Sequence, residues 1–449
     1  MDDTTLITWG DSAEANCRRL TNAHDKCVAW AKRFGAIFAP DKYQVIHFTK
    51  KRRVTEDLRS TVTIRGHNAE RVDSLRVLGV WLDSSLSWKD HIKRAVQKGH
   101  SAFESMARIT TSVWGPSVTK SRLIYTAIAR PVMMYGSQVW AARPGQEISS
   151  TTKLAPLATI QNKCLREVME AHKRTPIPAI ERESEVPPLD LHIRSQTAQW
   201  AASTATMPVT RDINKALKAV WKAASRRRQP ARGRRPRPAG PAPQSTMDDV
   251  REMVKQIKIT SAARIATDAN RGSNRPRTMQ MRSTGTLIDS HFTEVWRQRW
   301  IAEVEKRRNH RARVWHSPWQ LRPLSLYGDR PKHASTALFL LRTEVLGINS
   351  WLANVIPDHD PACGCGAPRQ TLGHLLSFCP NTTQALARLM ASTGSTNLRG
   401  LLDDKEKVGA ATRWLLDTGA LGQFRVAVEV EEEEVGTWRP FEALQDVSI

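Results

Sequence analysis

The sequence predicts an α+β protein in which a short mixed segment at the N-terminus precedes a mostly α-helical chain. Strand-like and helix-like patterns alternate within the first 88 residues, an order typical of the α+β class. Apolar residues then recur at spacings of three and four up to about residue 224 and again from about 287, which predicts helices. A compact group of cysteines and one histidine between residues 363 and 379 predicts a small zinc knuckle in the C-terminal helical region.

The first element predicted is a strand over residues 4–9, where small polar and apolar residues alternate. Residues 11–14 (DSAE) resemble a capping box and predict the start of a helix. Its apolar face has helical spacing and ends at Gly35, a typical helix stop; the face contains Cys17, Leu20, His24, Cys27, Ala31 and Phe34. Cys17 and Cys27 are therefore expected to be core residues and not metal ligands.

Three further strand-like segments follow, at residues 43–48, 61–66 and 76–83. A helix is predicted to begin at Trp88 and to end before the Gly-Pro-Ser sequence at 115–117; its apolar face contains Ile92, Val96, Gly99, Phe103 and Met106. A second helix is expected to kink or stop at Pro131, because proline removes a hydrogen bond and clashes with the preceding turn.

Residues 225–285 are predicted to form a basic linker without a packed core. Within it, residues 226–245 (RRRQPARGRRPRPAGPAPQS) have no apolar face to bury. Arginine-rich tracts of this kind bind phosphate backbones or act as nuclear localisation signals; the residues concerned are Arg226, Arg227, Arg228, Arg232, Arg234, Arg235 and Arg237. A merely solvated linker is the alternative.

Helical periodicity resumes near residue 287, where Phe292, Val295, Trp296, Trp300 and Val304 share one face. Residues 386–449 form a tail with weaker helical patterns. The acidic run at 428–434 is interpreted as a solvated end without a chemical role.

The charge balance favours a polyanionic partner. Lys and Arg number 68 against 44 Asp and Glu, a formal net charge of +24, and the arginines are interleaved with tryptophans. This composition predicts binding to RNA and DNA, with a solubilising surface as the alternative. The six cysteines are too few for a disulfide scaffold. No secretion signal or apolar run of membrane-spanning length is found, so an intracellular location and no membrane partner are expected.

The most specific motif is Cys363-x-Cys365-x8-His374-x4-Cys379. Three thiols and one imidazole are the ligand set of a closed structural zinc site, which leaves no open position for catalysis. Residues 371–378 are predicted to form a short helix that carries His374. Because a five-residue offset does not share a helix face, the helix must unwind before Cys379. The alternative is a chance grouping of four ligand-type residues.

Several segments together resemble the C-terminal half of a non-LTR (LINE-type) retrotransposon reverse transcriptase. Asp2 and Asp3 are similar to the end of the family's aromatic-x-Asp-Asp motif, and APDKYQVIHF (39–48) to the next palm motif. LRVLGVWLDSSLSWKDHI (75–92) resembles the primer grip, and SRLIYTAIARPVMMYGSQVW (121–140) the end of the thumb. LFLLRTEVLGINSWL (338–352) and the Cys–His motif resemble the family's C-terminal zinc knuckle.

The resemblance implies a domain order for the whole chain. It consists of a truncated palm remnant (1–88), the thumb with its connecting helices (89–224), the basic linker (225–285), a helical region with the knuckle (286–385) and the tail (386–449). In the family, Asp2 and Asp3 would bind catalytic Mg²⁺ together with an aspartate from an earlier strand. That earlier palm segment is not in this sequence, so we expect an incomplete site, no small-molecule substrate and no polymerase activity from this chain alone.

The function predicted is therefore that of a reverse-transcriptase fragment that retains nucleic-acid binding and carries structural Zn²⁺, located in the nucleus or also in the cytoplasm. A stand-alone zinc-knuckle protein that binds nucleic acid, or a mobile-element relic without function, are the alternatives. The family's RNase H domain is not expected, because residues 225–290 do not show the carboxylate arrangement that such a site needs.

Overall fold

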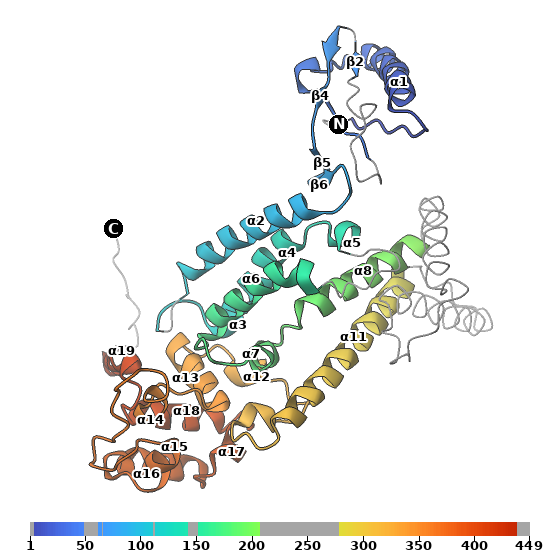
Figure 1. Ribbon diagram of the computed structural model, residues 1–449. Coiled ribbons are helices and arrows are strands. Elements are labelled where there is room, and N and C mark those ends of the chain that lie inside the picture. The colour runs from blue at the N-terminus through green and yellow to red at the C-terminus, as the bar shows by residue number, and fades with distance from the viewer. Residues whose placement is uncertain are drawn as a thin grey trace, which may run out of the picture. The chain divides into compact units, whose positions relative to one another are not determined.

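The computed structural model describes residues 4–48, 62–64, 66–110, 113–141, 151–206 and 278–437. The chain divides into two compact units, one formed by residues 1–98 and 134–140 and the other by residues 99–133 and 141–449. Helices dominate and the strands are few and short, which is compatible with the predicted α+β class (Figure 1).

Helix α1 (Ala13–Arg33) begins one residue later than the predicted capping box implies. Ser12 is the N-cap, and its side-chain oxygen accepts a hydrogen bond from the Ala15 N–H at 3.2 Å. Glu14 instead pairs with Arg18 at 2.8 Å. The predicted stop is confirmed, since Gly35 follows the helix with φ +71°, a conformation that glycine adopts without strain.

The strand predicted over residues 4–9 is wrong. These residues form no strand, and Ile7 and Trp9 are 73% and 82% exposed. An alternating pattern becomes a strand only when a neighbouring strand takes up its backbone groups, and no described strand pairs with this segment. The Trp9 carbonyl instead accepts a hydrogen bond from Arg19 Nη1 at 2.6 Å.

The strands predicted at 43–48 and 61–66 are present but short. After the 3₁₀ turn η1 (Pro40–Lys42), β1 (Gln44–Val45) pairs in parallel with β4 (Glu70–Arg71), while β2 (Thr63–Ile64) and β3 (His67–Asn68) form an antiparallel pair. They pack on α1 around a small core of Cys17, Val45, Val62, Ile64 and Ala69. Cys17 is thus a core residue as predicted, and Cys27 is half-buried.

Residues 76–83 belong to a hairpin and not to one strand. Strand β5 (Ser74–Val77) pairs with β6 (Val80–Asp83), and Leu78 and Gly79 form the turn between them. Both turn residues have positive φ, +46° and +85°, as a two-residue hairpin turn of type I′ requires. The apolar run does not reveal this reversal, because apolar residues continue through the turn at Leu78 and into Val80, Trp81 and Leu82.

Asp83 connects the hairpin to α2 (Lys89–Ala107). Its carboxylate accepts hydrogen bonds from the backbone N–H groups of Ser87 at 2.9 Å and of Trp88 at 2.7 Å. Trp88 therefore precedes the helix that it was predicted to begin. The short helix α5 (Ser137–Trp140) belongs to the same unit, and Trp140 packs against His91 with ring centroids 5.2 Å apart.

The predicted stop or kink at Pro131 takes a different form. Helix α3 (Val118–Ile124), capped by Ser117, continues through a π-helical segment η3 (Tyr125–Ala129) into α4 (Arg130–Met134). The Arg130 N–H donates to the Tyr125 carbonyl five residues earlier. This wider turn lies directly before the proline and changes the hydrogen-bond pattern there, so the helical path continues past it.

The second unit is helical wherever it has regular structure in the described ranges. Helices α6 (Thr151–Met169), α7 (Ile177–Ser184) and α8 (Leu189–Thr206) precede α11 (Thr278–Lys306), which begins earlier than the periodicity near 287 predicted. α8 and α11 lie side by side (Figure 1) and bury Leu191, Ala198, Ile288 and Phe292 between them.

The chain then continues through a series of short helices, of which α13 is almost completely buried. The elements in order are η5 (Arg313–Trp315), α12 (Leu324–Tyr327), α13 (Lys332–Thr343), α14 (Asn349–Leu352), α15 (Leu372–Ser377), η6 (Pro380–Thr382), α16 (Thr383–Thr393), α17 (Leu398–Leu401), α18 (Val408–Asp417), η7 (Gly422–Phe424) and α19 (Arg425–Thr437). Helix α13 packs on α18, and its residues 337–341 are almost completely buried.

The C-terminal tail is a larger part of the core than the sequence predicted. Trp414 on α18 is only 1% exposed. Within the acidic run at 428–434, Glu431 pairs with His333 at 3.2 Å and with Arg413 at 3.5 Å, so this run is not only a solvated end. No helix in the described ranges has both the length and the apolar character needed to cross a membrane.

Candidate metal centre

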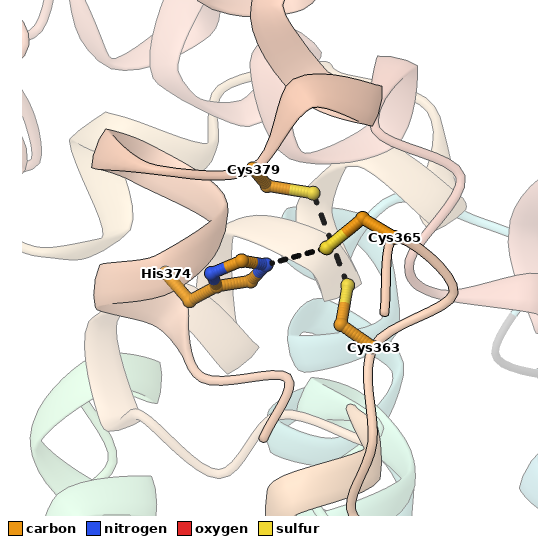
Figure 2. A group of neighbouring side chains, drawn as sticks. All are labelled: Cys363, Cys365, His374 and Cys379. Atoms are coloured by element: carbon orange, nitrogen blue, oxygen red, sulfur yellow. Dashed lines mark hydrogen bonds between the residues drawn. The ribbon is translucent and has the colours of Figure 1, made fainter. Parts of the chain in front are cut away.

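The four residues of the cysteine–histidine motif come together in the second unit, as the motif predicted. Cys363 and Cys365 lie in a tight turn, His374 on α15, and Cys379 just after that helix. One ligand atom from each residue lies within 4.8 Å of the other three. Figure 2 shows the three sulfurs and the imidazole ring facing one another.

The turn that carries the first two cysteines is closed by its own backbone. The Cys363 N–H donates to the Ala367 carbonyl and the Gly366 N–H donates to the Cys363 carbonyl, both at 2.9 Å. Gly366 has φ +91°, which only glycine adopts readily. Gly366 therefore shapes this turn, whereas Gly364 does not have a positive φ.

The helix that carries His374 is short, and it unwinds where the sequence predicted. The Thr371 side chain caps its start by accepting from the His374 N–H at 3.1 Å. At its end, the N–H groups of Phe378 and Cys379 both donate to the His374 carbonyl, at 2.9 and 3.0 Å. Cys379 then has extended backbone angles, φ −83° and ψ 116°, so its thiol faces the same point as the imidazole.

The spacing of the donor atoms fits a tetrahedral metal. Cys363 Sγ and Cys379 Sγ are 3.8 Å apart, and Cys365 Sγ lies 3.2 Å from His374 Nε2. A zinc ion with Zn–S bonds of about 2.3 Å and Zn–N bonds of about 2.0 Å places its ligands about 3.8 Å (S···S) and about 3.5 Å (S···N) apart. Zinc therefore fits with a small outward shift of Cys365 or His374. Soft thiolates do not suit Mg²⁺.

The local surroundings shift the pKa values of Cys365 and Cys363 in opposite directions. The N–H of Ala367 lowers the pKa of the Cys365 thiol to about 7, which favours the thiolate that binds metal. Burial raises the pKa of Cys363, which is only 6% exposed. A cation at the centre favours the thiolate form of such buried cysteines, so metal binding and loss of their protons are coupled.

Hydrogen bonds hold the metal-binding turn against α14. Asn349 Nδ2 donates to the Ala362 carbonyl at 2.7 Å, and the Asn349 N–H donates to Gln370 Oε1 at 2.9 Å. The Gln370 N–H in turn donates to the Pro361 carbonyl at 2.8 Å. These contacts hold the segments on both sides of the turn, at residues 361–362 and 370, against the start of α14.

Phe378 is a further feature of the site that the sequence did not single out. It lies directly before Cys379 and is 81% exposed. Its ring lies in solvent between the positions of two ligands, His374 and Cys379. The sequence could have pointed to Phe378 through its position directly before Cys379, the last cysteine of the motif.

The other predicted site residues cannot be placed beside this cluster. Asp2, Asp3 and the seven arginines of 226–237 lie outside the described residues, so their roles stay predictions. Cys17, Cys27 and Cys164 do not join the cluster. Over the described ranges, no second group of His, Cys, Asp or Glu has the geometry to hold a metal.

Comparisons with protein-family models, with curated proteins and with solved structures find no match for this chain. The resemblance to reverse transcriptases therefore stays an expectation based on the motifs alone, and the palm and thumb assignments receive no support.

Proposed function

We propose that this protein binds single-stranded nucleic acid and that a structural zinc ion holds its C-terminal binding module in shape. One observation carries the proposal: the exposed ring of Phe378 lies between the ligand positions His374 and Cys379. Exposed aromatic rings stack on unpaired bases, and this contact requires no particular sequence.

The charge of the chain supplies the second part of this function. A formal net charge of +24 attracts the phosphate backbone, and the Arg-rich segment 226–237 is the densest basic block in the sequence. Stacking at the knuckle and phosphate contacts elsewhere on the chain are independent contributions. Both RNA and DNA are proposed partners.

The chemistry of the cluster supports a structural and not a catalytic ion. Four protein ligands complete a tetrahedron and leave no position for a substrate or a reactive water. The zinc ion, when bound, neutralises and cross-links the thiolates. The chain's own residues fix the turn at Cys363, the end of α15 and the exposed position of Phe378.

We further propose that the chain derives from the C-terminal part of a non-LTR retrotransposon reverse transcriptase and acts in the nucleus. The order of the motifs along the chain supports this origin. A stand-alone zinc-knuckle protein would bind nucleic acid in the same way. The gene sequence distinguishes the two origins. An open reading frame that continues upstream of Met1 with fingers and palm motifs would favour an origin from the polymerase.

The experiment that tests binding uses the zinc-loaded chain and fluorescently labelled 20-nucleotide RNA and DNA, as single strands and as duplexes. We expect tighter binding to single strands, and a clear loss of that preference in Phe378→Ala. The matched control is Phe34→Ala, which removes another exposed ring (62% exposed) from the first unit. Equal affinity for single strands and duplexes, with Phe378→Ala unchanged, would contradict the proposal.

A further inference from the structure

A cavity of about 310 Å³ lies in the second unit between α7, the start of α8 and α11. This volume is near the lower limit for small-molecule sites, which range from about 300 to 1,000 Å³. The cavity shares no residue with the cysteine–histidine cluster. Its size suits one small ligand.

Two tryptophans of α11 form the aromatic part of the wall. Trp300 is stacked on Trp315, with ring centroids 5.1 Å apart and planes at 17°. Trp296 meets Trp319 edge to face at 5.4 Å and is only partly buried. Because both rings are held by other aromatic residues, they are already in place for a flat ligand and lose little freedom when one binds.

The buried polar group of the cavity wall is the carboxyl of Glu181 on α7, which is 8% exposed. Among the described residues, no donor gives it a hydrogen bond. Burial, and then the nearby charge of Asp190, raise the pKa of Glu181 to about 8. Near neutral pH the group is therefore a neutral acid with one O–H donor and one C=O acceptor side by side, and both are open to a ligand.

Two cations and the carboxylate of Glu303 also line the cavity. Arg299 binds Asp190 through two hydrogen bonds of 3.0 and 2.6 Å, and Lys306 contacts Glu303 at 2.7 Å. Arg307 also pairs with Glu303, so three cations share two carboxylates. Arg299 and Lys306 line the cavity, and their side chains are 44% and 68% exposed. Because both side chains are exposed, an anionic group on the ligand would contact Arg299 and Lys306 without a large desolvation cost.

We propose that this cavity binds a single nucleotide, with the base against Trp296, the base edge at Glu181 and the phosphate near Lys306 and Arg299. Each nucleobase has an edge that carries a hydrogen-bond donor next to an acceptor, and the neutral Glu181 carboxyl presents the complementary pair. This inference goes beyond the proposed function, since it requires neither the zinc cluster nor Phe378. The nucleotide is either free or an unpaired unit of a strand.

The test is a calorimetric titration of the zinc-loaded full chain with AMP, CMP, GMP and UMP, repeated with the corresponding nucleosides. We expect saturable binding of at least one nucleotide, weakened more than tenfold in Trp296→Leu. Glu181→Gln keeps a donor and an acceptor and should bind nearly as wild type, whereas Glu181→Leu should not bind. Lys306→Ala should weaken binding of the nucleotide but not of the nucleoside.

The control is Arg308→Ala, two residues beyond Lys306, where the side chain is 71% exposed and pairs with Glu305 outside the cavity. Displacement of the nucleotide by a single-stranded oligonucleotide would identify a strand as the source, and no displacement would identify a free nucleotide. The inference is overturned if none of the four nucleotides binds, or if Trp296→Leu binds as wild type. Binding that persists in Phe378→Ala separates this site from the knuckle.

Discussion

Arg342 and Glu183 form a two-point ion pair in which both side chains are completely buried. Arg342 Nε and Nη2 donate to the two carboxylate oxygens of Glu183 at 2.7 and 2.9 Å. Tyr327 donates to the same carboxylate at 2.6 Å, and Asp403 accepts from Arg342 at 2.9 Å. Burial alone would lower the pKa of Arg342, but the Glu183 charge outweighs it and the pKa is raised. This network connects α7, α12, α13 and the segment after α17.

Removing one partner of this pair should strongly destabilise the second unit. Arg342→Met leaves the Glu183 charge buried without its cation, at a cost of about 3–5 kcal/mol in the free energy of unfolding. Urea unfolding monitored by tryptophan fluorescence measures this. The exposed Arg308→Met serves as control, with an expected change within about 0.5 kcal/mol. The double variant Arg342→Met/Glu183→Leu should recover most of the loss, and equal destabilisation by the single and double variants would contradict this account.

Zinc should be bound at about one ion per chain through the cysteine–histidine cluster. Cys363→Ser should lose the metal and the protease resistance of residues 363–382, because the metal supplies part of the folding energy of such small sites. Cys27→Ser replaces a half-buried cysteine outside the cluster and should retain both. Elemental analysis of the purified variants and limited proteolysis test this, and a metal-free wild-type chain with an ordered knuckle would refute it.

Phe378→Ala should lower the affinity for single-stranded RNA by about 1–3 kcal/mol, the usual value for one base stacked on an aromatic side chain. The zinc content should be unchanged, since the ring does not hold the metal. Fluorescence anisotropy measures the affinity, and Phe34→Ala should bind as wild type. A loss of zinc together with affinity would show that Phe378 acts through the cluster and not through the base.

Nucleic-acid binding should weaken steeply with salt, because phosphate neutralisation releases counterions. Deletion of residues 226–237 removes seven arginines and should flatten the plot of log affinity against log salt concentration. A variant with these seven arginines replaced by glutamine keeps the segment length and should behave like the deletion. An affinity that does not respond to salt would exclude the electrostatic contribution.

The stability of the first unit should depend on Asp83 at low pH. Burial acts to raise the pKa of Asp83, but hydrogen bonds from Ser85, Ser87 and Trp88 outweigh it, and the pKa falls from 3.8 to about 2. A depressed pKa contributes stability above pH 3.8, and this contribution is lost as the pH falls through about 2. Asp83→Asn should reduce this pH dependence and cost about 1–2 kcal/mol at pH 7.

The control for Asp83 is Asp73→Asn, whose side chain is 93% exposed. Acid unfolding followed by circular dichroism compares the two variants with wild type. An identical acid transition in Asp83→Asn and wild type would show that the hydrogen bonds at the start of α2 do not stabilise the fold.

Glu181 should produce the opposite pH dependence. Its pKa is raised from 4.5 to about 8, chiefly by burial, so the folded state holds a proton that the unfolded state has released. Stability is therefore lost as the pH rises from about 4.5 through 8. Glu181→Gln carries no charge at any pH, so it should gain stability over wild type at pH 8 and gain little at pH 4.5. Thermal unfolding at both pH values measures the difference.

The sequence alone predicted those features that depend on a few neighbouring residues. The stop of α1 at Gly35, the ligand set of the cluster and the unwinding before Cys379 follow from backbone angles and hydrogen bonds within a turn or two. The strand predictions failed where the same local pattern is compatible with more than one structure. The apolar run within 76–83 fits one strand as well as the hairpin. Alternation over 4–9 predicts a strand, but no described strand pairs with this segment.

The tertiary structure alone decided which polar and aromatic groups are buried. Glu183 and Arg342 are 159 residues apart, and neither lies in a pattern that distinguishes it from a surface charge. Glu181 lies on the same short helix, and its burial in the folded unit, together with the nearby charge of Asp190, raises its pKa at the cavity wall. Local rules act over a few residues, whereas the burial of a charge depends on elements that are distant in the chain and meet only after folding.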